Sequence, residues 1–153
     1  MKRLTEEIIQ FFQRQSCVVV STVDKNGFPH SACKGIIKIN KNGRIYLLDL
    51  YQGKTYVNLT YNPTISLTAV DDHTCVGYCL KGKAKIIPQK KLLLGAIKAW
   101  EARIASRLTQ RLLKNIHEEK GSSRHPEALL PKPEYMILME VKEIVDLTPS
   151  HLK

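Results

Sequence analysis

Long apolar runs are missing from this sequence of 153 residues. No segment approaches the roughly 18 consecutive apolar residues that mark a membrane-spanning helix. The amphipathic stretch from Met1 to Gln15 carries Glu6 and Glu7, and it has neither the apolar core nor the small-residue cleavage site of a signal peptide. We therefore expect a cytoplasmic protein without a membrane partner.

Closely spaced metal ligands are missing too. The four cysteines form no C-x-x-C pair, and a zinc site usually joins such pairs to histidine, so we expect no metal site. Cys75 and Cys79 are four residues apart in a predicted strand, which would place both side chains on one face. Together with Cys17 and Cys33, they are interpreted as reduced thiols that pack as small apolar side chains.

Hydrolase motifs are also absent. The five histidines are scattered, and none belongs to an H-x-x-x-H pair or to a recognisable Ser/His/Asp arrangement. Hydrolytic catalysis therefore has little support, and no residue stands out as catalytic.

The composition is otherwise that of a globular protein. Apolar residues make up 43% of the chain, and a length of 153 residues suits a single domain, 1–153, with a full core. The net charge of +10 is the unusual property, and it indicates an anionic partner. Much of this charge is local, because nine Lys or Arg against three Glu lie between Pro88 and His125.

Strand and turn patterns alternate along most of the chain. Asp-Lys-Asn-Gly at 24–27 and Asn-Lys-Asn-Gly at 40–43 predict two successive hairpins. Gly77 and Gly82 indicate bulges or a close backbone approach in the fifth strand. Six mostly antiparallel strands favour a mainly β fold, a small β-barrel with flanking helices. The predicted strands are 17–23, 28–39, 44–50, 64–70, 74–87 and about 134–147.

Three helical segments accompany these strands. A short N-terminal helix is predicted over 5–15, a second over 52–61, and a helical insertion over about 88–119. The insertion has an apolar stripe in which Ile97, Trp100 and Ile104 recur at helical spacing, so this stripe is assigned to the core.

The start of the second helix is a candidate anion site. A strand leads into Gly53, and Lys54 and Thr55 follow in the first helical turn. Free N–H groups and the positive end of the helix dipole favour an anion there, and both side chains add donors. The alternative from the residues alone is that Lys54 is only solvated and Thr55 is a cap.

The surrounding residues resemble the FMN-binding split barrels of the pyridoxamine 5'-phosphate oxidase family. The matches in the phosphate region are Gly53, Lys54, Thr55, Asn58, Leu59, Asn62 and Pro63, followed by Gly82-Lys-Ala84 downstream. Residues 18–32 are similar to the first two strands of that family. The resemblance implies a six-stranded antiparallel split barrel of Greek-key type and a homodimer that holds FMN at its interface.

The resemblance also implies which residues bind the cofactor. Gly53, Lys54 and Thr55 would hold the phosphate. The residues that would flank the flavin are Ser31, Ala32, Cys33 and Lys34 of the second strand and Leu48 and Asp49 of the third. An isoalloxazine ring needs an apolar slot with a few polar groups at its edge. Deazaflavin and haem are the alternative cofactors within related split barrels.

Two departures from the family pattern concern the reaction. Cys33 stands where the oxidase has an arginine, and residues 146–153 lack the Trp, Arg and His cluster of its substrate segment. We therefore expect an FMN-dependent oxidoreductase other than that enzyme. A non-catalytic flavin-binding or electron-transfer protein is the alternative.

A second alternative is a nucleic-acid-binding module. Arg103, Arg107, Arg111 and Lys114 recur at helical spacing and make a basic stripe over 103–114. Aromatic residues do not alternate with these charges, so a solvated helix face or an attractor of anionic partners explains the stripe better.

Overall fold

The computed structural model describes residues 1–88, 95, 97–102, 104–106, 109 and 133–152. Within these residues the fold is mainly β, with two α-helices in the first 61 residues, further helical backbone at 95, 97–102, 104–106 and 109, and a short 3-10 helix at the C-terminal end. The helices are α1 (Glu6–Arg14), α2 (Lys54–Tyr61) and η3 (Ser150–Leu152). The strands are β1 (Val18–Val23), β2 (Pro29–Ile39), β3 (Arg44–Asp49), β4 (Thr64–Val70), β5 (Gly77–Pro88) and β6 (Tyr135–Asp146).

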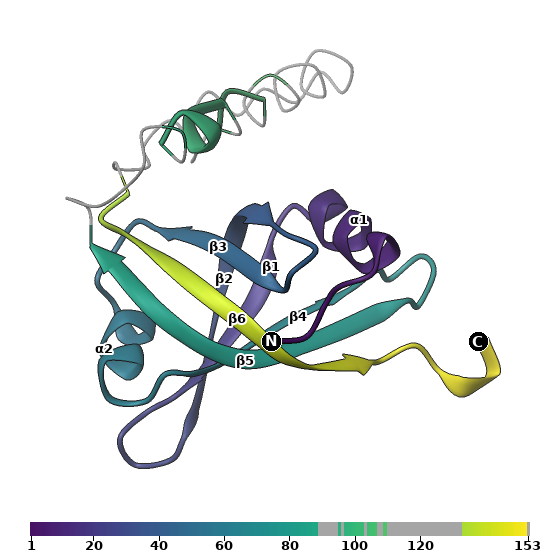
Figure 1. The fold of residues 1–153 in the computed structure, drawn as a ribbon, viewed down its shortest axis with the longest axis horizontal. Coiled ribbons are helices and arrows are strands. Elements are labelled where there is room, and N and C mark those ends of the chain that lie inside the picture. The colour runs from purple at the N-terminus through teal and green to yellow at the C-terminus, as the bar shows by residue number, and fades with distance from the viewer. Residues whose placement is uncertain (89–94, 96, 103, 107–108, 110–132, 153) are drawn as a thin grey trace, which may run out of the picture.

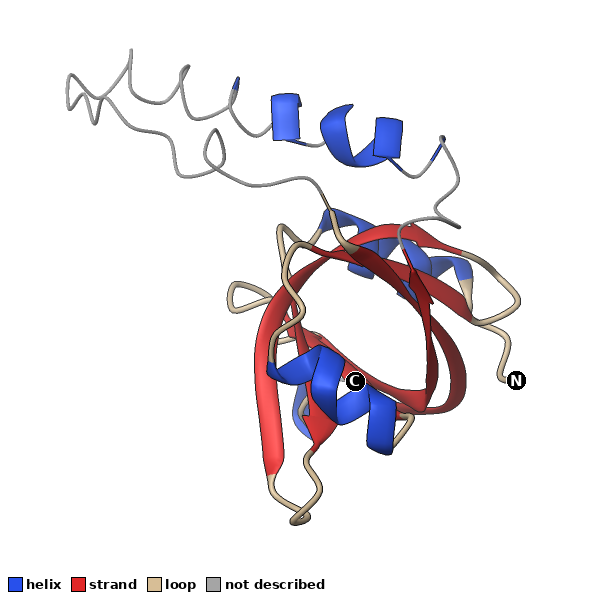
Figure 2. Ribbon diagram, turned by 90° about the vertical axis from the view of Figure 1, so that its left-hand side faces the viewer, coloured by secondary structure: helices blue, strands red, loops and turns tan. Residues whose placement is uncertain are grey.

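The six strands close into one antiparallel barrel. Their order around the barrel is β1-β2-β3-β6-β5-β4, and Figures 1 and 2 show the strands curving around a common interior. Closure depends on two pairings between strands distant in sequence, β1 with β4 and β3 with β6. The predicted six-stranded antiparallel barrel with flanking helices is confirmed.

Alternating side chains fill the barrel. On β1 the buried residues are Val18, Val20 and Thr22, while the residues between them face outward. Leu67, Leu80 and several side chains of β6 join the same core cluster. This period-two pattern is what a half-buried strand requires, and it also places a second set of side chains on the outer surface.

Helix α1 packs onto this core through one apolar face. Thr5 begins the helix, because its hydroxyl oxygen accepts a hydrogen bond from the backbone N–H of Ile8 at 3.3 Å. Ile8, Ile9 and Phe12 are buried, and Phe12 has no exposed surface at all. None of the described helices is long and apolar enough to cross a membrane.

The element boundaries differ from the predictions mainly around the turn before β5. This strand starts at Gly77 instead of residue 74, because the Asp71 carboxylate accepts hydrogen bonds from the N–H groups of His73 and Thr74 and holds a turn. Cys75 has a φ of 55° in that turn. The expectation that Cys75 shares a strand face with Cys79 is therefore wrong.

The other end of β5 also differs from the prediction. The strand continues to Pro88, where the helical insertion was expected to begin. Helical backbone is present at 95, 97–102, 104–106 and 109. The remainder of the predicted insertion, including Arg103, Arg107, Arg111 and Lys114 of the basic stripe, lies outside the described residues.

Candidate functional site

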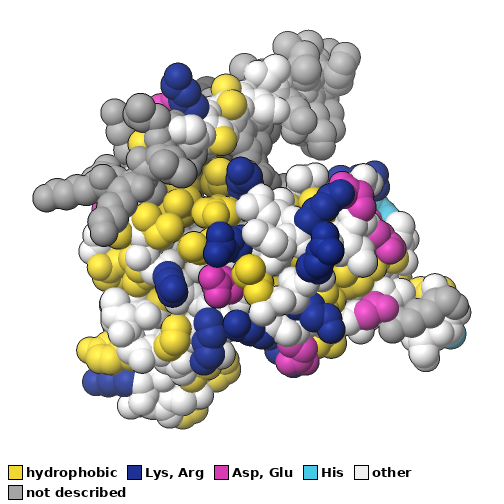
Figure 3. Space-filling model, viewed as in Figure 1, with side chains coloured by type: hydrophobic (Ala, Val, Ile, Leu, Met, Phe, Trp, Pro, Cys, Tyr) yellow, Lys and Arg dark blue, Asp and Glu magenta, His cyan; other side chains and the backbone are white. Residues whose placement is uncertain are grey.

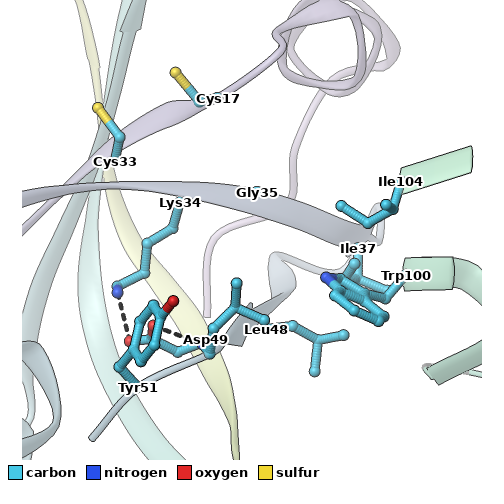
Figure 4. Close-up of a pocket in the computed structure, with 11 residues that line it drawn as sticks. Cys17, Cys33, Lys34, Gly35, Ile37, Leu48, Asp49, Tyr51, Trp100 and Ile104 are labelled. Atoms are coloured by element: carbon cyan, nitrogen blue, oxygen red, sulfur yellow. Dashed lines mark hydrogen bonds and ion pairs between the residues drawn. The ribbon is translucent and has the colours of Figure 1, made fainter. Parts of the chain in front are cut away.

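A cavity lies between the outer surface of β2 and β3 and the helical segment that contains Trp100. Its volume is about 370 Å³. Ile37, Leu48, Trp100 and Ile104 give it an apolar wall. In Figure 4, Trp100 and Ile104 approach from the helical segment and meet Ile37 and Leu48 of the strands. A volume and wall of this kind are typical of small-molecule and cofactor sites.

One edge of the cavity carries a buried charge pair. The Lys34 ammonium forms an ion pair with the Asp49 carboxylate, and their side chains are only 10% and 9% exposed. The Tyr135 hydroxyl donates a hydrogen bond to the same carboxylate oxygen. The Leu50 backbone N–H donates to the other carboxylate oxygen at 2.9 Å, so Asp49 has three donors and the Lys34–Asp49 pair is fixed at the edge of the cavity (Figure 4).

The strand register explains why these groups meet. Asp49 is the last residue of β3 and pairs with Tyr135, the first residue of β6. The Tyr56 ring of α2 packs edge-on against Tyr135, with 4.9 Å between the ring centroids. Burial, together with the hydrogen bond to Asp49 and its charge, raises the pKa of the Tyr135 hydroxyl. That hydroxyl therefore stays protonated and remains a donor.

Four of the predicted flavin-flanking residues line this one cavity. They are Cys33 and Lys34 of β2 and Leu48 and Asp49 of β3. The other two predicted flanking residues do not line it. The Ser31 and Ser21 hydroxyl oxygens lie 2.8 Å apart and share a hydrogen bond across β1 and β2, and Ala32 is half-buried on the opposite face of β2 from Cys33.

The predicted phosphate residues lie at the start of α2. Gly53 is the N-cap and provides no side-chain hydrogen bond to the first turn. Lys54 is exposed and lines a second cavity with the β1–β2 turn, while Thr55 is only 3% exposed and turns toward the barrel. The chain from Asp49 to Tyr51 lines the first cavity, so α2 begins a few residues beyond its wall.

Sequence reasoning missed several contributors to the cavity and its edge, among them Trp100, Tyr135 and Cys17. The sequence patterns predict Trp100 in the core stripe, Tyr135 as an ordinary strand residue, and Cys17 as a packing residue. Pairing of β3 with β6 brings Tyr135 to Asp49, and that register could not be derived from local patterns. The alternation of β1 was the available signal for Cys17, since it lies two residues before the outward-facing Val19.

Comparison with known protein families identifies the chain. Residues 4–130 match the family described as pyridoxamine 5'-phosphate oxidase. The chain belongs to this family. Since the match covers most of the sequence, it confirms the family that the sequence resembles. No curated protein sequence matches the chain.

Solved structures share the same fold at low sequence identity. The HupZ protein of Group A Streptococcus is 20% identical and has a TM-score of 0.64, with 95% of this chain and 94% of that chain covered. A Clostridium acetobutylicum protein of the pyridoxinephosphate oxidase family is 15% identical, with a TM-score of 0.57 and coverage of 96% and 95%. HutZ, the haem storage protein of Vibrio cholerae, is 19% identical, with a TM-score of 0.54 and coverage of 94% for both chains.

Proposed function

We propose that this protein is an FMN-binding flavoprotein that works as an FMN-dependent oxidoreductase. One observation carries the proposal: four residues that the family resemblance assigns to the flavin site, Cys33, Lys34, Leu48 and Asp49, line a single cavity. The spacing of these residues along the chain does not by itself bring them together, because two of them belong to β2 and two belong to β3.

The cavity suits the ring system of FMN. A flat aromatic ligand can pack against Leu48 and Trp100, and its polar edge can face the Lys34 ammonium. Bound FMN would supply hydride or single-electron transfer. The chain itself contributes an apolar wall and, at its edge, a neutral Lys34–Asp49 ion pair that the Tyr135 hydroxyl helps to fix. The Lys34 ammonium carries three N–H donors, so it can donate to a polar atom at the edge of the ligand while it stays paired with Asp49.

The start of α2 suits the phosphate. Because Gly53 offers no side-chain cap, the N–H groups of the first turn are available to an anion, and Lys54 adds an exposed ammonium beside them. We therefore assign the phosphate to Gly53, Lys54 and Thr55, with Thr55 acting through its backbone N–H, since its side chain is buried.

We also propose that two chains form a homodimer with FMN at the interface, as the family resemblance implies. Large apolar side chains are exposed on the β1–β2 turn and on α2. Phe28 is 68% exposed and Tyr61 is 70% exposed. Val57 and Tyr61 of α2 line one cavity with Asp24, Lys25 and Asn26 of the β1–β2 turn, so α2 and this turn belong to one region of the surface. Figure 1 shows the positions of α2 and β1 in the fold.

The reaction differs from oxidation of pyridoxamine phosphate. The departure at residues 146–153 affects the substrate segment of the oxidase, since its cluster of Trp, Arg and His is missing here, and Cys33 in place of an arginine is a second departure. A protein that only carries flavin or electrons is the alternative. The two differ in turnover: an oxidoreductase passes electrons repeatedly from a donor to an acceptor through bound FMN, whereas a carrier releases its FMN unchanged.

The absorbance spectrum of the purified full-length protein tests the cofactor. We expect the bands of oxidised flavin, before or after addition of FMN, and binding weakened about 10-fold or more by Lys54→Ala, because a charge-assisted contact is worth about 1.5–3 kcal/mol. Lys85→Ala, at an exposed lysine of β5, is the matched control and should bind as wild type does. A colourless protein that takes up no FMN would refute the proposal, and a Soret band would assign haem instead, as in HutZ.

A further inference from the structure

Two thiols lie at the rim of the cavity, and the proposed function uses one of them, Cys33, only as a residue that flanks the flavin. Cys17 and Cys33 both line the cavity, and both are exposed free thiols. They come from neighbouring antiparallel strands, and in Figure 4 their sulfur atoms lie next to each other on the same side of those strands. They are therefore a pair of adjacent thiols accessible from solvent.

The strand register places them close together. Cys33 pairs with Val19, so Cys17, two residues earlier on the same outward face, is its diagonal neighbour. Side chains on this face do meet across the two strands, since the Ser21 and Ser31 hydroxyl oxygens are 2.8 Å apart. Repulsion from Cys17 is the main reason that the pKa of the Cys33 thiol is raised, with partial burial and a hydrogen bond to Cys17 adding to it.

We propose that Cys17 and Cys33 form a redox-active dithiol that small-molecule disulfides convert into an intramolecular Cys17–Cys33 disulfide at the cavity rim. This site stands on the two thiols and their strand register alone, and it goes beyond the proposed flavin function. Cys17 is assigned as the thiol that reacts first, because it precedes β1 and lies outside the regular pairing with β2.

The exchange needs no further oxidant. The Cys17 thiolate attacks the small disulfide, forming a mixed disulfide on Cys17 and releasing one small thiolate. The Cys33 sulfur then attacks Cys17 Sγ, its proton passes to solvent or to the leaving thiolate, and the second small thiol departs. Two protein thiols are oxidised to one disulfide, and one small disulfide is reduced to two thiols.

The backbone at Cys17 can accommodate the bond. A disulfide needs Cβ atoms about 3.8 Å apart, which is closer than diagonal neighbours usually lie. Cys17 precedes β1, whose first residue is Val18, and it therefore lies outside the regular pairing with β2. Closing the bond draws this end of β1 toward Cys33, whereas Cys33 stays fixed in the middle of β2.

Peptide mapping of the full-length protein tests the proposal. Trypsin separates the two cysteines, with Cys17 in peptide 15–25 and Cys33 in peptide 26–34, while Cys75 and Cys79 share peptide 55–81. After incubation of the reduced protein with glutathione disulfide and blocking of the remaining thiols, we expect peptides 15–25 and 26–34 to be linked, on a chain of monomer mass in a non-reducing gel.

Matched variants separate this result from general thiol reactivity. Cys33→Ser should accumulate glutathione on Cys17, because the second thiol is missing, whereas wild type should not. Cys75→Ser should leave the linkage unchanged, and the exposed Cys75 of wild type reports that the reagent reaches the protein. Stable glutathione on Cys17 in wild type, unreacted Cys17 and Cys33 while Cys75 reacts, or a link between two chains would each overturn the proposal.

Discussion

Lys34 and Asp49 form a nearly buried ion pair at the edge of the cavity, and their energetics depend on one another. Removing two charges from water costs several kcal/mol per ion, and mutual attraction offsets this only when both partners are present. The Tyr135 hydroxyl gives Asp49 a further donor. The pair therefore contributes fixed polar groups to the site more than it contributes net stability.

Loss of one partner should be far more harmful than loss of the whole cluster. Asp49→Ala leaves the Lys34 ammonium buried without its counter-ion, and we expect the free energy of unfolding to fall by about 3–5 kcal/mol. Combining Lys34→Met, Asp49→Leu and Tyr135→Phe should recover most of that loss. Urea denaturation of both variants measures the difference.

An exposed pair provides the control for this prediction. Lys81 and Glu143 are also ion-paired, at 3.0 Å, but their side chains are 50% and 58% exposed. Lys81→Ala should therefore cost less than about 1 kcal/mol. Equal losses for Lys81→Ala and Asp49→Ala would show that burial of the Lys34–Asp49 pair has no energetic effect.

Tyr135 should make stability fall at alkaline pH. Its pKa is raised above the ordinary value of 10.0, mainly by burial. Below pH 10 both the folded and the unfolded chain keep the proton, so the contribution to stability is complete. As the pH rises further, only the unfolded chain releases the proton, and the free energy of unfolding decreases.

The comparison of Tyr135→Phe with wild type isolates this effect. Phenylalanine has no proton to lose, so the variant should be less stable at neutral pH by about 1 kcal/mol for the lost hydrogen bond, yet show a flatter decline above pH 10. Tyr61→Phe, at a side chain that is 70% exposed, should follow the wild-type curve. Parallel curves for Tyr135→Phe and wild type would contradict the prediction.

At the scale of elements, Gly82 is a position where β5 and β6 lie too close together to admit a side chain. The pairing of the two strands shifts register between Lys81 and Gly82. A Cβ at Gly82 would lie 2.1 Å from the Glu140 carbonyl oxygen, which is backbone and cannot turn away. The predicted close approach in the fifth strand is confirmed here, since only glycine fits this contact.

Gly82→Ala should therefore destabilise the barrel by about 1–3 kcal/mol or more, because the strands must separate to admit a methyl group. Gly35→Ala is the matched control within β2, since a Cβ at Gly35 would meet no atom within 4 Å. Thermal unfolding of the two variants gives the comparison. A change in Tm that is as large for Gly35→Ala as for Gly82→Ala would show that the close contact is not the cause.

Local sequence patterns predict the strands well. They predict that the strands form a barrel, but they do not predict which distant strands pair to close it. The glycine turns at 24–27 and 40–43 fix the ends of β1, β2 and β3, and their φ values of 87° at Gly27 and 81° at Gly43 are those that glycine permits. The pairing of β1 with β4 depends on side chains about 45 residues apart, such as Val20 and Leu67, and no local pattern encodes it.

The residues of the candidate site likewise divide into those that the sequence predicts and those that depend on distant pairings. The family resemblance supplied Cys33, Lys34, Leu48 and Asp49, which the fold then brings into one cavity. The partner of Asp49 on β6 follows from a pairing across 86 residues, and the contact with Trp100 depends on where a helical segment crosses the outside of the barrel. Neither could be derived from composition or periodicity.

At the scale of the whole molecule, positive charge is distributed without forming one continuous patch on the face seen in Figure 3. Lys and Arg side chains lie among acidic ones across β3, β5 and β6. Lys81 is paired with Glu143, and Arg44 lies 4.0 Å from Glu140. The described basic side chains on this face therefore attract anionic ligands weakly and broadly.

The proposed homodimer is a property of the whole molecule. Substitutions in one surface region, made of the β1–β2 turn and α2, should disrupt its interface. Phe28 and Tyr61 are the most exposed large apolar side chains of the β1–β2 turn and α2. If they become buried between two chains, Phe28→Asp with Tyr61→Asp should weaken association by roughly 2 kcal/mol or more. Sedimentation equilibrium measures this, and FMN binding should weaken in parallel if the interface completes the site.

Val70 provides the matched control, because it is apolar and 55% exposed but lies at the end of β4, where the chain turns toward β5. Val70→Asp should leave both the dimer and FMN binding unchanged, which separates loss of a specific interface from a general effect of added negative charge. Circular dichroism should show that both charged variants keep the barrel, since all three side chains are exposed. A wild-type protein that is monomeric while saturated with FMN would rule out a site shared between two chains.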